Sequence, residues 1–163
     1  MNRKAIVALL LALAFCATGW GLEKPDFSGT WKLNVDKSDY GDLQGPSSRT
    51  DTIEERDGEI RESVISEGRR KTQKYVLRFS TDGRKTILPA GDGIRIPPVT
   101  LHSISATWQG NSLVVVEGLT HEGSDIVAKY AYTLSPDENI LTMTVSLNGG
   151  APAATFVFDK VKE

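Results

Sequence analysis

The chain has 163 residues, of which 25% are charged and 39% apolar, and its formal net charge is −2. This length suits one domain that buries roughly two thirds of its unfolded surface, and the composition is that of a soluble globular protein. The acidic balance argues against nucleic acid as a partner, because phosphate binding requires clustered positive charge.

Residues 1–21 are predicted to be a secretory signal peptide. Arg3 and Lys4 form a positive start, an apolar run follows over residues 5–15, and small residues stand at 17–19. This run is too short to cross a bilayer, which takes about 20 residues, so no transmembrane segment is expected in the mature chain. Export to the periplasm or the extracellular space is the prediction, and it leaves 17 basic against 21 acidic residues.

Cys16 is the only cysteine of the chain. Leu13 stands at the spacing of a lipoprotein signal, but the residue before a lipidated cysteine should be small, and here it is Phe15. Ordinary cleavage is therefore favoured over lipidation. The mature domain, residues 22–163, would then need neither disulfides nor a reducing compartment.

From residue 26 onward the side chains alternate between apolar and polar, which is typical of half-buried strands. In residues 26–34, Gly29, Trp31 and Leu33 share one face. Residues 36–41 lose the alternation and are predicted to form a helical turn begun by Asp36, and residues 42–49 to form a loop.

The next strands are predicted at residues 50–56, 59–67 and 71–80, and Asp57-Gly58 between the first two is a strong hairpin signal. Their expected inner face carries Ile53, Ile60, Glu62, Val64, Tyr75, Leu77 and Phe79. Residues 84–99 contain three prolines, which exclude a central strand, so we expect an edge or a mobile rim there.

Further strands are predicted near residues 100–108, 113–116, 126–134 and 141–147, with a last strand that ends near residue 160. The fold class is therefore all-β, with eight to ten strands and antiparallel neighbours joined by short turns. An up-and-down β-barrel is favoured because closure removes exposed edges. A two-sheet β-sandwich remains the alternative, because alternation alone does not separate the two.

The stretch Phe27-Ser28-Gly29-Thr30-Trp31-Lys32-Leu33 resembles the Gly-x-Trp first strand of the lipocalins and fatty-acid-binding proteins, the calycins. Together with Lys37-Ser38-Asp39-Tyr40-Gly41, it also resembles short secreted lipocalin-like proteins of bacteria. The resemblance implies a lipocalin-like barrel in which Trp31, beside Gly29, plugs the closed end. It also implies that a basic residue of the last strand lies across this Trp, and Lys160 is the candidate.

Candidate ligand-binding residues are those that the alternation sends inward. They are the aromatic side chains Tyr75, Phe79, Trp108, Tyr130 and Tyr132 and the polar side chains Glu62 and His102. A packed core and an apolar cavity with phenol groups are both compatible with these residues. Inside the barrel, Glu62 and His102 would need to pair with each other or with a ligand. A position near the rim, or a slip of the strand, is the favoured explanation of these two residues.

The sequence contains no recognisable catalytic motif, cofactor motif or metal-ligand spacing. Three functions remain open. The first is an exported barrel that binds a small hydrophobic molecule, and the second is a non-enzymatic envelope or interaction scaffold with a solid core. The third and least favoured is an enzyme that uses Glu62 and His102 for acid–base chemistry.

Overall fold

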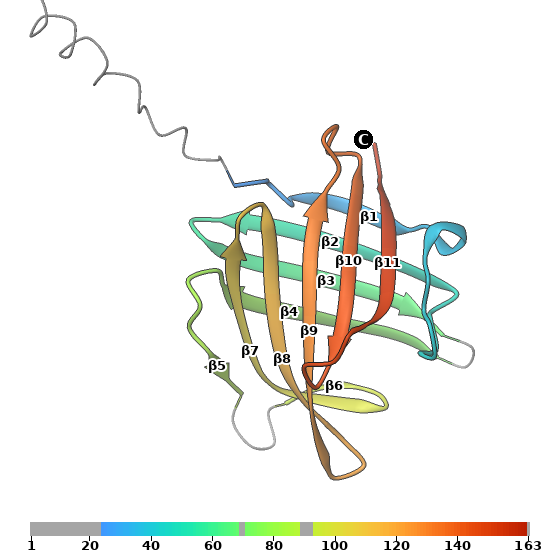
Figure 1. Ribbon diagram of the computed structural model, residues 1–163, viewed down its shortest axis with the longest axis vertical. Helices are drawn as coiled ribbons and strands as arrows, with labels where there is room; N and C mark the ends of the chain where they lie inside the picture. The colour runs from blue at the N-terminus through green and yellow to red at the C-terminus, as the bar shows by residue number, and fades with distance from the viewer. Residues whose placement is uncertain (1–23, 69–70, 89–92, 163) are drawn as a thin grey trace, which may run out of the picture.

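Eleven antiparallel strands form one continuous sheet that curves into a nearly closed barrel (Figure 1). The computed structural model describes residues 24–68, 71–88 and 93–162. The predicted signal peptide and Cys16 lie outside the described residues. In the part of the chain that is described, no helix is long and apolar enough to cross a membrane.

The strands follow the hydrophobic alternation and are separated mainly by short turns. In chain order they are β1 Gly29–Leu33, β2 Ser48–Arg56, β3 Glu59–Glu67, β4 Thr72–Ser80, β5 Thr86–Ile87, β6 Ile94–Ile96, β7 Val99–Gln109, β8 Ser112–His121, β9 Ser124–Leu134, β10 Ile140–Leu147 and β11 Pro152–Lys160.

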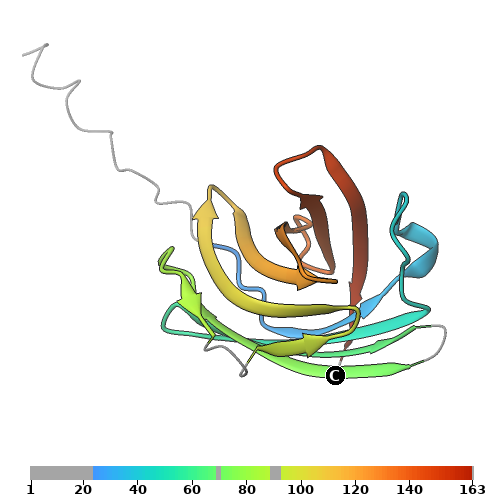
Figure 2. The ribbon, with the colours of Figure 1, turned by 90° about the horizontal axis from the view of Figure 1, so that it is seen from below.

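The strand order is β4-β3-β2-β1-β11-β10-β9-β8-β7-β5, and β6 also pairs with β7. The first and last strands are hydrogen-bonded neighbours, so β1 joins the two halves of the sheet. Figure 2 shows β7 to β11 arching over the layer formed by β1 to β4. The predicted antiparallel barrel is confirmed, and the continuous pairing through β1 replaces the two-sheet alternative.

The barrel closes incompletely between β4 and β7. Just after β4, Asp82 forms an isolated bridge with Thr107, and the Gly83 amide donates to the Ala106 carbonyl at 2.8 Å. Along the rest of β7, the short strands β5 and β6 take the place of a full neighbour. The proline-rich stretch therefore forms an edge, as expected, and contributes two short strands.

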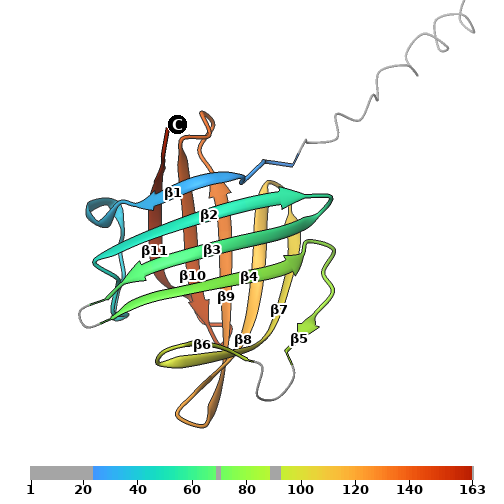
Figure 3. The same ribbon diagram turned by 180° about the vertical axis from the view of Figure 1, so that it is seen from behind.

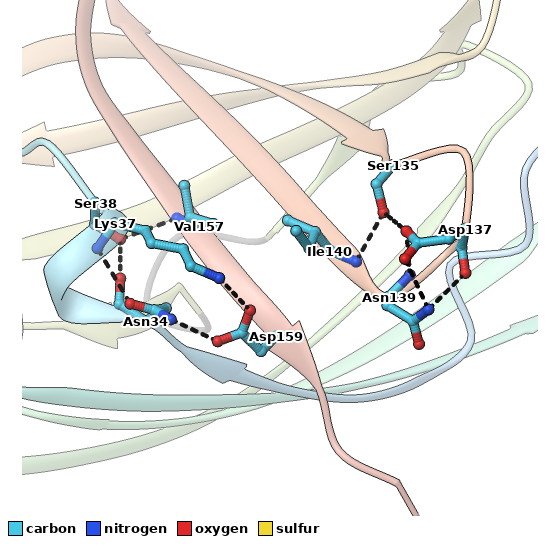
Figure 4. A network of polar contacts seen from close by, with 9 residues as sticks. All are labelled: Asn34, Lys37, Ser38, Ser135, Asp137, Asn139, Ile140, Val157 and Asp159. Atoms are coloured by element: carbon cyan, nitrogen blue, oxygen red, sulfur yellow. Dashed lines mark hydrogen bonds and ion pairs between the residues drawn. The ribbon is translucent and has the colours of Figure 1, made fainter.

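The helical turn after β1 starts one residue earlier than predicted. It is a 3-10 helix, η1, at Val35–Lys37, and its N-cap is Asn34, whose side chain accepts from the Lys37 amide. Figure 4 shows how η1 is attached to β11: Asn34 Nδ2 donates to Asp159 at 2.6 Å, and Lys37 Nζ donates to the same carboxylate at 3.1 Å. This contact holds the connection between β1 and β2 outside the barrel wall.

The turn between β9 and β10 is the other polar network in Figure 4. The Asp137 carboxylate accepts from the side chains of Ser135 and Asn139, and these hydrogen bonds lower its pKa to about 2. The Ser135 hydroxyl in turn accepts from the Ile140 amide at 3.0 Å. The turn at Ser135-Pro136-Asp137 is thus built from short-range side-chain hydrogen bonds.

Candidate functional site

One end of the barrel is closed by aromatic side chains. Trp31 is fully buried, and its Nε1 donates to the Phe27 carbonyl at 2.9 Å. The Phe27 ring stacks on Trp108 with centroids 5.6 Å apart, and Lys24 Nζ lies 5.5 Å from the Trp108 ring centroid. Trp108, a candidate ligand contact from the sequence, therefore packs in this aromatic plug.

Lys160 lies across Trp31, so the structure brings together the pair named from the sequence. The two residues face each other in the β1–β11 register, and Lys160 Nζ is 5.0 Å from the centroid of the indole ring. Gly29 makes room for the lysine: its φ is +138°, and a Cβ there would lie 3.1 Å from Lys160 Cε. All three residues therefore act in closing this end of the barrel.

The interior holds a small cavity of about 70 Å³. Its lining comes from β2, β4, β6, β7, β8 and β9, and consists of Arg49, Tyr75, Leu77, Ile96, Val99, Glu117, Leu119, Tyr130 and Tyr132. In Figures 1 and 3, β6 lies across the end of the barrel opposite to where β1 begins and β11 ends. The cavity is thus bordered by the β6–β7 hairpin, away from the chain termini.

A buried ion cluster adjoins this cavity. Arg49 Nε donates to both carboxylate oxygens of Asp51, at 2.8 and 3.1 Å. Its Nη2 lies 3.6 Å from Glu62 Oε1, and its guanidinium lies 5.6 Å from the Phe158 ring centroid. The side chain of Arg49 is 13% exposed, and those of Asp51 and Glu62 are almost completely buried. One cation thus faces two carboxyl groups that are almost completely buried.

Burial controls the protonation of the interior carboxyl groups. It raises the pKa of Glu62 to about 8, with a further increase from the nearby negative charge of Asp51 and an opposing effect of Arg49. Burial also raises the pKa of Glu117 to about 7, opposed by a hydrogen bond from Tyr130 and by Arg49. The phenol of Tyr75 is affected in the same way, and its pKa rises to about 12.

Three of the predicted ligand contacts, Tyr75, Tyr130 and Tyr132, line the cavity. Glu62 lies beside it in the ion cluster, and Phe79 packs in the hydrophobic core. The structure therefore gathers the tyrosines and the glutamate in one region and places Phe79 and Trp108 elsewhere.

The alternation of the sequence sends His102 inward, but the structure shows a slip of the strand, which is the favoured alternative for this residue. The pairing of β7 with β8 shifts between Leu101 and Ser103, and such a bulge puts one extra residue in the strand and changes which face follows. Gly118 points outward, because its neighbours Glu117 and Leu119 line the interior. A Cβ on Gly118 would lie 2.6 Å from His102 Cε1, so the imidazole lies on the side of the wall opposite to Glu117, where its Nε2 is still buried.

His102 and Glu62 therefore lie on opposite sides of the barrel wall and do not meet. The pair proposed for acid–base chemistry is not assembled, which removes the motivation for the enzyme hypothesis. Within the described residues, no group of three or more His, Cys, Asp or Glu side chains is arranged to hold a metal ion.

The two charged residues that line the cavity, Arg49 and Glu117, are not among the candidates from the sequence. The predicted loop over residues 42–49 includes Arg49, although Arg49 stands at alternate positions with Asp51 and Ile53, two buried residues of β2. Glu117 follows an apolar run in β8, and counting by two from Leu113 and Val115 would have placed it inside. In both cases the alternation extended beyond the predicted strand.

A larger depression of about 540 Å³ lies on the surface near the β2–β3 hairpin. Most of its lining is charged and includes Glu54, Glu59, Arg56, Arg61 and Arg78. Glu54 and Arg61 form an exposed ion pair at 2.9 Å. This depression is open to solvent. The buried polar side chains that could contact a ligand line the interior cavity instead.

No protein-family model and no curated protein sequence matches this chain. Solved structures do match. A secretory abundant heat soluble protein from Ramazzottius varieornatus is 14% identical, with 83% of this chain and 95% of that chain covered and a TM-score of 0.59. Human cRBP IV is 14% identical over 84% and 99% of the two chains, with a TM-score of 0.52.

A fatty-acid-binding protein from Manduca sexta is 12% identical over 82% of this chain and 99% of that chain, with a TM-score of 0.50. At such identities the likeness concerns the fold alone. The chain therefore has the calycin-like β-barrel fold that the Gly-x-Trp strand led us to expect.

Proposed function

We propose that this protein binds a small, largely hydrophobic molecule in the interior of its barrel. The observation that carries the proposal is the interior cavity, in which leucine, isoleucine and valine side chains meet a few polar groups. Sites for small molecules typically combine an apolar lining with a small number of placed polar groups. One structure with a similar barrel is described as a fatty-acid-binding protein, which is consistent with this use of the fold.

The size of the cavity restricts the ligand. A volume of about 70 Å³ is well below the ~300–1,000 Å³ of sites that enclose drug-sized molecules. We therefore propose a ligand whose buried part is short, or one that enters as the β6–β7 hairpin moves outward. Next to this hairpin, the Gln73 side chain donates to the Pro97 carbonyl, a contact between β4 and the β6–β7 turn that such a movement would break.

A cavity-filling variant tests the proposal. Binding of hexan-1-ol, a neutral probe with a short chain, is followed by chemical-shift changes in two-dimensional NMR spectra of the wild-type protein and of Leu119→Trp, whose larger side chain fills the cavity. The control is Thr120→Trp, because Thr120 is the next residue of β8 and points to the other face. We expect Leu119→Trp alone to lose binding while its circular dichroism stays unchanged. Equal binding by all three proteins, or by none, would refute an interior site.

The second candidate, a non-enzymatic scaffold with a solid core, is favoured by one observation. Most inward side chains belong to a continuous hydrophobic cluster, as in small barrels that are filled by their own side chains. If organic extracts of the purified protein contain no small molecule by mass spectrometry and no probe binds, the scaffold becomes the better account, and cross-linking in the source cells would then identify its partner.

We also propose that the protein is exported. The support is the order of a basic start, an apolar run and small residues within residues 1–21. N-terminal sequencing of the protein recovered from a cell fraction tests this: a start near residue 22 in an exported fraction supports cleavage. A full-length cytoplasmic chain contradicts it, and a lipid-modified Cys16 would support the lipoprotein alternative.

A further inference from the structure

The polar groups around the interior cavity carry an excess of acidic side chains. Asp51, Glu62 and Glu117 are buried carboxyl groups, and Arg49 is the cation that faces them among the described residues. Electrostatic interactions between buried groups are stronger than the same interactions in water. Three groups that can ionise to carboxylates stand against one cation, so their protonation influences which ligands can enter.

Arg49 is already engaged. Both oxygens of Asp51 accept from its Nε at 2.8 and 3.1 Å, and Glu62 lies 3.6 Å from its Nη2. An entering carboxylate would have to compete with Asp51 for the guanidinium and would at the same time approach Glu117. Because like charges repel strongly where water is excluded, this cavity is unfavourable for an anionic ligand.

Glu117, by contrast, lacks a charged partner. It lines the cavity, is 5% exposed, and forms no ion pair within the described part of the chain. In addition, Glu62 Oε1 is buried without a hydrogen bond. The hydrogen bond that Glu117 receives from Tyr130 comes from a neutral group. A buried carboxylate without a counter-charge is costly, and a cation placed in the cavity would supply that charge.

We propose that the interior site selects ligands with a positively charged end, such as an ammonium group, on a short apolar chain. Glu117 pairs with the cation, and the hydroxyl groups of Tyr75 and Tyr130 line the same cavity and offer further hydrogen-bond acceptors. Leu77 and Leu119 provide the apolar contacts for the chain. This inference rests on the proposed function, since it assumes that the cavity is a ligand site.

Three probes of equal chain length distinguish selection of a positively charged ligand from binding of any small hydrophobic molecule. Hexylamine, hexan-1-ol and sodium hexanoate are titrated into the protein at pH 8 and followed by chemical-shift changes in two-dimensional NMR spectra. At this pH the amine is protonated, and Glu117, with a pKa of about 7, is largely ionised. We expect hexylamine to bind about tenfold or more tightly than hexanol, the factor expected for one charge-assisted hydrogen bond, and hexanoate to bind most weakly.

The outcomes are distinguishable. If hexanol or hexanoate binds in the cavity as tightly as hexylamine or more tightly, the inference fails and the proposed function stands. If none of the three shifts the resonances of cavity residues, the proposed function fails, and the inference with it.

A matched pair of variants identifies the group responsible. Glu117→Gln removes the charge and keeps the shape of the side chain, and it is expected to remove most of the preference for hexylamine over hexanol. Glu59→Gln makes the same change at an exposed position of β3 and is expected to leave the preference unchanged. An unchanged preference in Glu117→Gln, with hexanol still bound, would overturn the assignment to Glu117.

Discussion

At the scale of single residues, Arg49 determines the charge balance of the interior. It is the partner of two buried carboxyl groups, and it stands one position from the start of β2. Removing one partner of a buried ion pair leaves a desolvated charge behind, which costs much more than the loss of an exposed pair.

We therefore predict that Arg49→Met destabilises the protein by about 3–5 kcal/mol at neutral pH. The matched control is Arg61→Met, because Arg61 pairs with Glu54 at the surface, and its loss should cost no more than about 1 kcal/mol. Urea unfolding followed by circular dichroism measures both values. Equal effects of the two substitutions would show that Arg49 is not a structural partner of Asp51 and Glu62.

The raised pKa values of Glu62, about 8, and Glu117, about 7, predict a pH dependence of stability. In the unfolded chain these groups ionise near pH 4.3, so between that pH and their folded pKa values the folded state holds more protons. Stability must then fall as the pH rises from about 5 to 8, by about 1.4 kcal/mol per pH unit for each group that differs by one full proton.

Urea unfolding at a series of pH values tests whether the free energy of unfolding falls as the pH rises. In Glu117→Gln the slope between pH 5 and 7 should become shallower, because one of the two groups no longer takes up a proton on folding. A stability that is constant or increases across this pH range in the wild-type protein would contradict the burial of these carboxyl groups in ionisable form.

At the scale of elements, the bulge in β7 decides which side chains face inward. It pairs Ser103 with Gly118, and the space above Gly118 is occupied by the Ser103 hydroxyl and the His102 ring. A Cβ on Gly118 would lie 2.4 Å from Ser103 Oγ. The glycine in β8 and the bulge in β7 therefore depend on each other.

Gly118→Ala is expected to destabilise the protein by about 1–3 kcal/mol, the usual cost of overpacking, as measured by thermal or urea unfolding. Gly110→Ala does not serve as a control, because Gly110 has φ +60° and an alanine there would strain the backbone. At Gly118 the added methyl group would instead collide with neighbouring side chains. A better test is the double variant with His102→Ala and Ser103→Ala, in which the added methyl group should cost much less. An equal cost in both backgrounds would contradict the proposed contact.

At the scale of the whole molecule, the barrel is continuous on one side and open on the other. β1 is paired on both edges, with β2 and β11, whereas β4 pairs with β3 and meets β7 through the bridge that follows it. Residues from both sides of this opening, Tyr75 and Val99 among them, line the cavity. The opening between β4 and β7 is thus next to the candidate site.

Hydrogen exchange should show the difference between β1, which is paired on both edges, and β4, which is paired along one edge. We expect about every second backbone amide of β4, those not bonded to β3, to exchange much faster than the amides of β1, because unpaired edge groups are exposed to solvent. Two-dimensional NMR spectra recorded after transfer to heavy water measure both strands at once. Uniform protection of β4 and β1 would mean that the barrel closes more fully than these strands indicate.

The sequence by itself determined the all-β class, the antiparallel order of neighbours and most strand positions, because alternation with period two and Asp-Gly or Asn-Gly turns are local properties. The alternation also identified the three tyrosines that line the cavity, whereas the pairing of Trp31 with Lys160 was implied by the resemblance to the calycins. These successes concern residues in regular strands, where the face of a side chain follows from counting by two.

Only the tertiary structure decided the composition of the candidate site. Arg49 and Glu117 meet in one cavity because closure brings β2 and β8 to face each other across the interior, a relation between strands far apart in the chain. His102 is outside because one extra residue in β7 shifts its face, and no local pattern marks that bulge. The charge of the interior, and with it the ligand class, therefore depends on contacts that exist only when the barrel is closed.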